Sequence, residues 1–229
     1  MTFANELAKL GDFYVNDAFG AAHRNHTSTA KLAKVLKPAV SGLLMEKEIR
    51  CLSQALDNPQ RPFTAIVGGA KVSSKITIIN NILPVIDNLI IGGGMTYTFV
   101  KAQGGSIGNS LVEEDKLELA LEILEECKKH HVNVYLPIDN LIADNFSNDA
   151  NRQLTKVGEI PDGWMGMDAG PETIQQNAEV IKNSKTILWN GPLGVFEMSN
   201  FANGTIALGD AIANATTNGA FSLVGGGDS

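Results

Sequence analysis

The chain has 229 residues, of which 44% are hydrophobic and 19% charged, and its formal net charge is −7. A chain of this length can bury roughly 70% of its unfolded surface, and its composition excludes disordered and fibrous classes. Its charges are of mixed sign with an acidic excess, which argues against a nucleic-acid partner. We therefore expect a globular protein.

Targeting and cysteine signals are weak. The longest apolar runs fall short of the roughly 20 residues that span a membrane, and the N-terminal residues MTFANELAKLGD lack the pattern of a signal peptide. Cys51 and Cys127 are far apart and form no CxxC motif, so neither a disulfide framework nor a zinc site is expected. These features favour a cytoplasmic protein with no membrane partner.

Short apolar runs recur along the chain and predict strands at Phe13–Phe19, Phe63–Val67, Asn88–Ile91, Val132–Pro137, Thr186–Trp189 and Ala220–Val224. Most of them lack alternation of apolar and polar residues, which is typical of strands buried on both faces. The predicted fold class is therefore α/β, a doubly wound parallel sheet of the Rossmann-like, three-layer αβα type.

Helical patterns lie between these runs. Glu113–His131 has an apolar stripe at helical spacing, and the pair Ser110 and Glu113 predicts a capping box at its start. Leu43–Leu56 predicts a second helix, which connects two bodies. Pro161–Gly170 is so rich in glycine and proline that we expect a loop.

Three of the strands run into glycines, in FTAIVGGAKVSSK, NLIIGGGMTYT and AFSLVGGGDS. A strand that ends in glycine before a helix exposes backbone N–H groups that suit phosphate. The runs match neither GxxxxGK[ST] nor GxGxxG, so the familiar nucleotide fingerprints are absent. The pattern still indicates a phosphate-bearing ligand.

The first run adds two cations, Lys71 and Lys75, whose spacing of four places them on one face of a helical turn. There they can neutralise phosphoryl oxygens, although both can equally be ordinary solvated lysines. Asn190 and Glu197 follow another strand, in NGPLGVFE, where ligands of α/β sheets bind; a surface loop is the alternative. Asp228 is a hard oxygen ligand that suits Mg²⁺, or part of a simple turn.

Arg24 follows the first predicted strand, in YVNDAFGAAHRNH. Its planar guanidinium can bind a carboxylate or a phosphate through two parallel hydrogen bonds. The neighbouring histidines are too short a signal for a metal site, and a pair of surface histidines beside an arginine is the commoner explanation.

Together, YVNDAFGAAHRNH, GGAKVSSK, IIGGGMTYTFVKAQG, SLVEEDKLELA, IPDGWMGMDAGP, ILWNGPLGVFE and SLVGGGDS resemble phosphoglycerate kinase, and they cover nearly the whole chain in that family's order. The resemblance implies transfer of a phosphoryl group between 1,3-bisphosphoglycerate and Mg-ADP, giving 3-phosphoglycerate and ATP in glycolysis. It also implies a monomeric parent enzyme with a substrate-binding N-domain, a hinge helix and a nucleotide-binding C-domain.

The resemblance carries roles to individual residues. Arg24 matches an arginine at the acid-substrate side, and Lys75 matches the lysine that stabilises the migrating phosphoryl group. The matches to nucleotide-binding positions are Lys71, Lys75, Gly92, Gly93, Phe146, Gly166, Asn190, Pro192, Val195, Glu197, Gly226, Gly227, Asp228 and Ser229, with Asp228 also the metal ligand. No covalent nucleophile is needed for such a transfer.

Family members extend beyond both ends of this sequence. We therefore expect residues 1–41 to be a remnant of the N-domain, residues 42–57 the hinge helix, and residues 58–229 a truncated C-domain, with little or no activity in isolation. Two alternatives stay open: a non-catalytic nucleotide-binding module, and glycines that serve only strand-to-helix packing.

Overall fold

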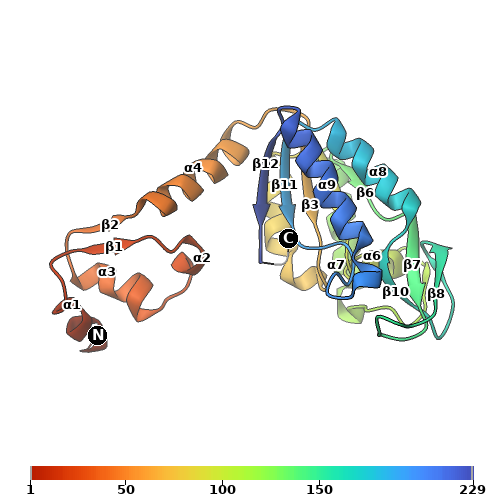
Figure 1. The fold of residues 1–229 in the computed structure, drawn as a ribbon, viewed down its shortest axis with the longest axis horizontal. Coiled ribbons are helices and arrows are strands. Elements are labelled where there is room, and N and C mark those ends of the chain that lie inside the picture. Colours follow the sequence, from red (N-terminus) through yellow and green to blue (C-terminus); the bar gives the residue numbers. More distant parts are fainter. Residues whose placement is uncertain (1, 228) are drawn as a thin grey trace. The chain divides into compact units, whose positions relative to one another are not determined.

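The computed structural model describes residues 2–227 and residue 229, and Asp228 therefore lies outside the described residues. The chain divides into two compact units, Met1–Asp57 and Asn58–Ser229. Figure 1 shows the elements of each unit. The domain roles expected from the sequence stay predictions.

The first unit is small. It contains α1 (Thr2–Ala8), β1 (Tyr14–Asn16), α2 (Phe19–Ala22), a π-helix (Thr27–Lys31), α3 (Leu32–Val35), β2 (Ala39–Ser41) and α4 (Leu43–Asp57). Strands β1 and β2 pair in parallel. The predicted strand Phe13–Phe19 is too long, because Phe19 already begins α2. The predicted helix at 43–56 is confirmed as α4, whose first turn is held by the Met45 N–H that donates to Asp17 Oδ1 at 2.8 Å.

The second unit is built on a five-stranded parallel sheet in the order β12-β11-β3-β4-β6. The strands are β3 (Phe63–Val67), β4 (Asn88–Ile91), β6 (Asn133–Tyr135), β11 (Thr186–Asn190) and β12 (Phe221–Gly225). The chain enters at β3, winds outward to β6, and then returns to β11 on the other side of β3. This order makes the sheet doubly wound and confirms the predicted fold class, with its switch point between β3 and β11.

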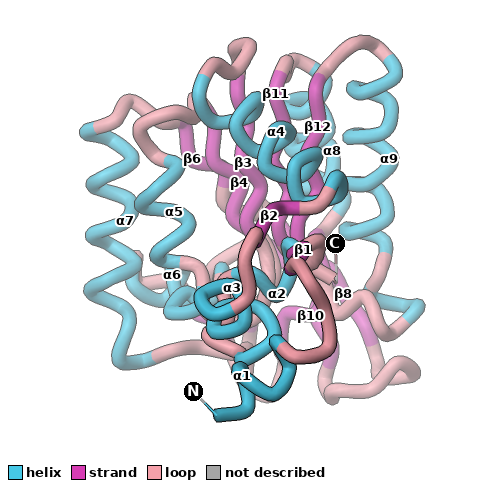
Figure 2. The backbone as a smooth tube through the Cα atoms, turned by 90° about the vertical axis from the view of Figure 1, so that its left-hand side faces the viewer, coloured by secondary structure: helices cyan, strands magenta, loops and turns pink. Residues whose placement is uncertain are grey.

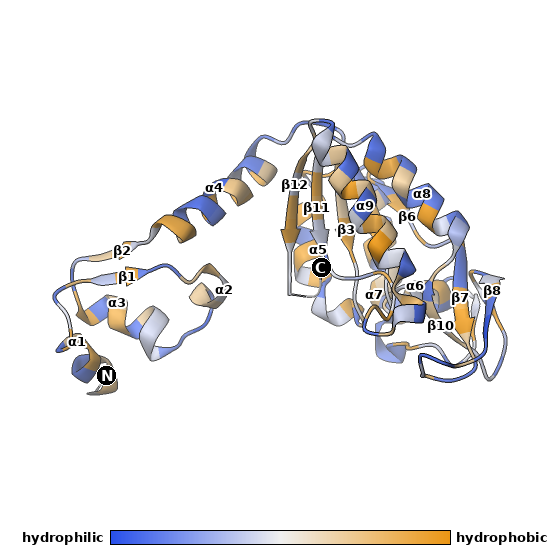
Figure 3. Cartoon of the chain, in the orientation of Figure 1, coloured by the Kyte–Doolittle hydropathy of each residue, from blue (hydrophilic) through white to orange (hydrophobic). Residues whose placement is uncertain are grey.

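Helices cover both faces of this sheet, as Figure 2 shows. Helices α5 (Ile76–Ile82) and α7 (Leu117–Lys129) lie on one face with α6 (Thr96–Ala102), and α8 (Pro171–Lys182) and α9 (Asn203–Thr217) lie on the other. In Figure 3 the central strands are hydrophobic along their length, whereas α8 and α9 each carry one hydrophobic side. The core under these two helices centres on Ile66, Ile187 and Trp189. Three layers follow from this amphipathic pattern.

Two smaller sheets lie beside the main one. Strands β7 (Asp139–Ala143), β8 (Arg152–Lys156) and β10 (Met165–Ala169) form an antiparallel sheet in the order β10-β7-β8, and β5 (Ser106–Ile107) pairs with β9 (Glu159–Ile160). The expectation of a loop at 161–170 is therefore wrong over its second half. Tertiary pairing with β7 overrides the low strand propensity of Met-Gly-Met.

The predicted start of the long helix is also wrong. Helix α7 begins at Leu117 after a short 3₁₀ turn (Glu114–Lys116), and neither Ser110 nor Glu113 caps it. Instead, Ser110 Oγ accepts a hydrogen bond from the Gly166 N–H at 2.9 Å. Glu113 accepts hydrogen bonds from Ser73. Long-range partners thus replace the local capping pattern.

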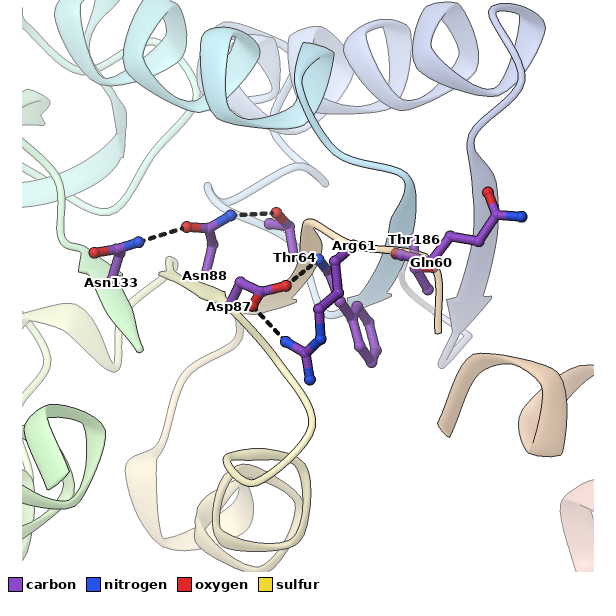
Figure 4. Close-up of polar contacts among 8 residues, drawn as sticks. Gln60, Arg61, Thr64, Asp87, Asn88, Asn133 and Thr186 are labelled. Carbon is purple, nitrogen blue, oxygen red and sulfur yellow. Dashed lines mark hydrogen bonds and ion pairs between the residues drawn. The ribbon is translucent and has the colours of Figure 1, made fainter. Parts of the chain in front are cut away.

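Polar side chains join the amino ends of the strands (Figure 4). Asn133 Nδ2 donates to Asn88 Oδ1 at 3.1 Å, and Asn88 Nδ2 donates to Thr64 Oγ1 at 3.1 Å. The Thr64 hydroxyl is also 2.6 Å from Ser184 Oγ. We call this row of four side chains the polar ladder.

The linker that precedes β3 is tied to the same edge. Asp87 accepts hydrogen bonds from the Arg61 guanidinium and from the Phe63 N–H (Figure 4). On the other side, Thr186 Oγ1 donates to the Gln60 carbonyl at 2.8 Å. In the part of the chain that the structure describes, no helix is both long and apolar enough to cross a membrane.

Candidate functional site

The carboxyl ends of β3 and β11 touch at the switch point of the sheet. The Gly68 N–H donates to the Asn190 carbonyl at 2.9 Å. A Cβ on Gly68 would lie 2.1 Å from the Pro192 carbonyl oxygen, and Gly191 has a φ of +100°. Only glycine permits this backbone contact, which explains part of the sequence signal without invoking phosphate.

A cleft of about 380 Å³ opens beside this contact, within the size range of small-molecule sites. Most of its wall is apolar or glycine backbone. It is lined by Gly69, Ala70, Gly93, Gly94, Tyr97, Leu111, Phe146, Met165, Gly166, Met167, Pro192, Leu193, Gly194, Val195, Phe196 and Glu197. The structure therefore brings together six residues that the resemblance assigns to the nucleotide: Gly93, Phe146, Gly166, Pro192, Val195 and Glu197.

Gly92 is placed differently. A Cβ on Gly92 would lie 2.1 Å from Leu193 Cδ2, and the residue borders a separate space of about 10 Å³. The structure does not place Gly92 on the wall of the cleft.

Lys75 reaches the carboxyl edge, where its Nζ donates to Asn190 Oδ1 at 2.5 Å. Its side chain also passes Gly69 of the cleft wall, since a Cβ there would lie 3.5 Å from Lys75 Cε. The lysine ammonium and the Asn190 amide thus lie at the carboxyl edge, next to Gly69 of the cleft wall. An ammonium at this place can neutralise the oxygens of a phosphoryl group.

Lys71 departs from the expected geometry. It has an extended backbone, with φ −132° and ψ 131°, before the 3₁₀ turn Val72–Ser74, and Lys75 is the residue that precedes α5. The two lysines therefore do not share a helical face. Lys71 is exposed, and its predicted contact with phosphate stays a prediction.

The third glycine run meets the same edge. The Gly191 N–H donates to Ser229 Oγ at 2.7 Å, and Ser229 Oγ donates to the Gly225 carbonyl at 2.9 Å. Gly226 has a φ of +95°, and Gly226 and Gly227 are exposed. The prediction of Asp228 as nucleotide and metal ligand falls outside the described residues.

Arg24 belongs to the Met1–Asp57 unit, where it is exposed just after α2. Its carbonyl accepts a hydrogen bond from Thr29 Oγ1 at 2.8 Å, which fixes the turn that carries it. The guanidinium is thus available to an anion, and its assignment to the acid substrate stays a prediction.

Sequence reasoning missed a buried polar group behind the cleft. Asp168 of β10 is only 3% exposed, and it accepts hydrogen bonds from the Ala169 N–H at 2.8 Å and from the Gly204 N–H, at the start of α9, at 2.9 Å. Burial raises the pKa of Asp168 from 3.8 to about 6, against the opposing effect of these backbone donors. Burial, with the nearby Asp168 charge, raises the pKa of the Tyr97 phenol. Only a strand assignment at 165–169 could have revealed Asp168.

No group of three or more possible metal ligands occurs among residues 2–227 and 229. The mostly apolar wall of the cleft suits the apolar body of a ligand, and Lys75 at the adjoining carboxyl edge can bind an anionic group. The fold and this site together define a doubly wound α/β protein with a ligand cleft at its switch point.

Comparisons with known proteins specify the family. The phosphoglycerate kinase family model matches residues 1–229. The chain is similar to the phosphoglycerate kinase of Coxiella burnetii, with 44% identity and a TM-score of 0.89, over 98% of this chain and 57% of that one. It is similar to the phosphoglycerate kinase of Pyrococcus horikoshii OT3, with 30% identity and a TM-score of 0.82, over 97% of this chain and 56% of that one.

The chain belongs to the phosphoglycerate kinase family, a family of phosphotransferases. The resemblance read from the motifs is thereby confirmed. The chain spans just over half the length of the solved structures that it matches.

Proposed function

We propose that this chain carries the nucleotide-binding part of a phosphoglycerate kinase, which transfers a phosphoryl group between 1,3-bisphosphoglycerate and ADP. In the direction of ATP synthesis, the bond between phosphorus and the acyl oxygen breaks, and a bond to an oxygen of the ADP β-phosphate forms. The observation that carries the proposal is a mostly apolar cleft whose wall residue Gly69 lies beside the side chain of Lys75, which is hydrogen-bonded to Asn190.

In this proposal the apolar wall holds the adenosine part of the nucleotide. Phe146 is 59% exposed and borders the cleft, so its ring is free to cover a ligand. Glu197 is exposed at the same cleft and offers a carboxylate to ribose hydroxyls. The wall supplies contact area, and the few polar groups set orientation.

Lys75 holds the phosphoryl group that moves. Asn190 Oδ1 fixes the ammonium at the carboxyl edge, where its charge faces the phosphoryl oxygens of a nucleotide in the cleft. Phosphoryl transfer needs mainly such positioning and charge neutralisation. Arg24 binds the acid substrate in the same proposal, because its guanidinium matches a carboxylate or phosphate.

Magnesium enters this proposal only together with the nucleotide phosphates, whose charge it neutralises. Its predicted protein ligand, Asp228, lies outside the described residues.

The test is Mg-ADP binding to the 229-residue chain by calorimetry, with Lys75→Ala against the control Lys185→Ala. Loss of a charge-assisted contact at Lys75 is expected to weaken binding about tenfold or more, while the control binds as the wild type does. No binding by the wild-type chain would overturn the proposal.

A coupled assay of phosphoryl transfer on the same proteins separates the enzyme from a non-catalytic nucleotide-binding module. We expect low turnover by the wild-type chain that Lys75→Ala abolishes. In a version extended to the length of its relatives, firm ADP binding without transfer would favour the module.

A further inference from the structure

The segment Ser110–Glu113 runs between the two sides of the cleft. At one end, the buried Ser110 hydroxyl accepts a hydrogen bond at 2.9 Å from the N–H of Gly166, a residue of the cleft wall on β10. Ser110 is 6% exposed, so loss of this contact would leave a backbone donor poorly solvated. This end of the segment therefore fixes the β10 side of the cleft.

At the other end, the Glu113 carboxylate binds the turn between the two lysines. Glu113 Oε1 accepts from Ser73 Oγ at 2.5 Å, and Oε2 accepts from the Ser73 N–H at 3.1 Å. Desolvation raises the pKa of Glu113, but the hydrogen bonds from Ser73 and from the Val72 N–H outweigh it, and the net pKa is lowered. The carboxylate thus occupies two of the backbone donors that follow the first glycine run, those of Val72 and Ser73.

This occupation corrects the simplest interpretation of that run. The N–H groups that precede α5 were expected to face phosphate, and instead those of Val72 and Ser73 face a carboxylate of the protein. The cation that reaches the carboxyl edge is the Lys75 side chain, whose backbone N–H donates to the Val72 carbonyl at 2.9 Å. Whatever holds the Val72–Ser74 turn therefore also places Lys75.

The middle of the segment lies on the cleft. Leu111 is 48% exposed and borders the cleft beside Gly94. The backbone is tied at both flanks, by the Asn109 N–H to the Trp164 carbonyl at 2.7 Å and by the Glu113 N–H to Thr98 Oγ1 at 3.1 Å. One short segment thus touches β10, the cleft and the lysine turn.

We propose that Ser110 and Glu113 are positioning residues, which strap the β10 wall of the cleft to the turn that carries Lys75. This role rests on the proposed nucleotide site. Neither side chain contacts the nucleotide. Instead, the strap fixes the distance between the adenosine end and the phosphoryl end, so that ADP meets both at once.

A competing explanation predicts the opposite change in the affinity for ADP. If Glu113 only repelled an anionic ligand near the lysines, its removal would strengthen ADP binding. The strap predicts weaker binding, about tenfold for Glu113→Ala and for Ser110→Ala. Because the strap acts only while both of its ends are held, the double variant should bind about as weakly as either single variant.

The experiment is calorimetric titration with Mg-ADP of wild type, Ser110→Ala, Glu113→Ala, Glu113→Gln and the double variant. Glu114→Ala is the matched control, since Glu114 is the next residue, is exposed, and pairs with Lys101. Glu113→Gln keeps an acceptor for the Ser73 N–H and should recover most of the binding. Tighter or unchanged binding by Glu113→Ala, or an effect equal in Glu114→Ala, would overturn the proposal, and so would additive losses in the double variant.

Hydrogen exchange of the ligand-free proteins tests the strap without nucleotide. Glu113→Ala should raise amide exchange at Val72–Ser74, and Ser110→Ala should raise it at 165–168, with Glu114→Ala unchanged at both. Unchanged exchange in both variants overturns the strap. Failure of wild type to bind ADP instead overturns the proposed function, so the two failures are distinguishable.

Discussion

The two ends of the five-stranded sheet use their polar groups in opposite ways. At the amino edge, the members of the polar ladder hydrogen-bond one another, and Asp87 binds the linker before β3. At the carboxyl edge, glycines bring backbones into contact, and Lys75 and Asn190 lie beside a cleft. A parallel sheet aligns all its strand ends, so one edge can specialise in stability and the other in binding.

The largest effect should come from a glycine at the carboxyl edge. In Gly68→Ala the new Cβ would lie 2.1 Å from the Pro192 carbonyl, and both backbones would have to move. We expect the free energy of unfolding to fall by roughly 3 kcal/mol or more. Urea denaturation followed by tryptophan fluorescence measures it, since Trp164 and Trp189 both lie in the second unit.

Gly209→Ala is the matched control for that substitution. Gly209 lies inside α9, and a Cβ there would make ordinary contacts of 3.8 Å with Trp189. We expect a gain of about 0.5–1 kcal/mol from helix propensity. Equal losses in both variants would refute the steric argument.

The next effect concerns the buried carboxylate behind the cleft. Burial raises the pKa of Asp168 to about 6, above its ordinary value of 3.8, so between these values the folded state binds more protons than the unfolded state. Its contribution to stability therefore falls as pH rises from about 4 to about 6, by at most roughly 3 kcal/mol. Urea denaturation at pH 4.5 and pH 7 on wild type and Asp168→Asn measures the difference.

The difference between wild type and Asp168→Asn isolates the contribution of the Asp168 carboxyl to the pH dependence of stability. The pKa values of Glu113, Asp115 and Glu126 are lowered, mainly by hydrogen-bonded partners in the last two and despite desolvation in Glu113. Those groups stabilise the fold above their unfolded pKa values and lose that effect on acidification, in both proteins alike. A pH slope that Asp168→Asn leaves unchanged would refute the assignment.

A smaller effect is expected at the polar ladder. Thr64 is fully buried, and Thr64→Val leaves Asn88 Nδ2 and Ser184 Oγ without this partner. The free energy of unfolding should fall by about 1–3 kcal/mol, with ADP binding unchanged. Thr64→Ser keeps the hydroxyl and serves as control. A loss of ADP affinity in Thr64→Val would contradict the assignment of stability to the amino edge and of binding to the carboxyl edge.

How far the sequence predicts this architecture depends on the range of the contacts. Apolar runs such as Phe63–Val67 and Asn88–Ile91 appear as strands with the predicted bounds. Their residues are buried on both faces of the sheet, so the local sequence alone is apolar enough to indicate a strand. Met165–Ala169 fails the same reasoning, since its strand exists only through pairing with β7.

The candidate site shows the same dependence. Three residues that the motif resemblance assigns to the nucleotide, Gly93, Phe146 and Gly166, line one cleft, although their roles stay predictions. Local rules place Lys71 on a helix and Glu113 at a cap, and both fail because partners distant in sequence decide the backbone there. Asp168, hidden in an assumed loop, carried no local signal.

The smallest effect separates two contacts at the amino edge that share one carboxylate. Asp87 binds both the Arg61 guanidinium, on a side chain that is 54% exposed, and the Phe63 N–H at 2.7 Å. Arg61→Ala removes only a solvated ion pair and should cost about 0.5 kcal/mol, less at high salt. Asp87→Ala also leaves the Phe63 N–H without its acceptor, so it should cost more and keep that excess at high salt. Equal, salt-sensitive losses in urea denaturation would show that the ion pair, and not the backbone contact, holds the linker to the sheet.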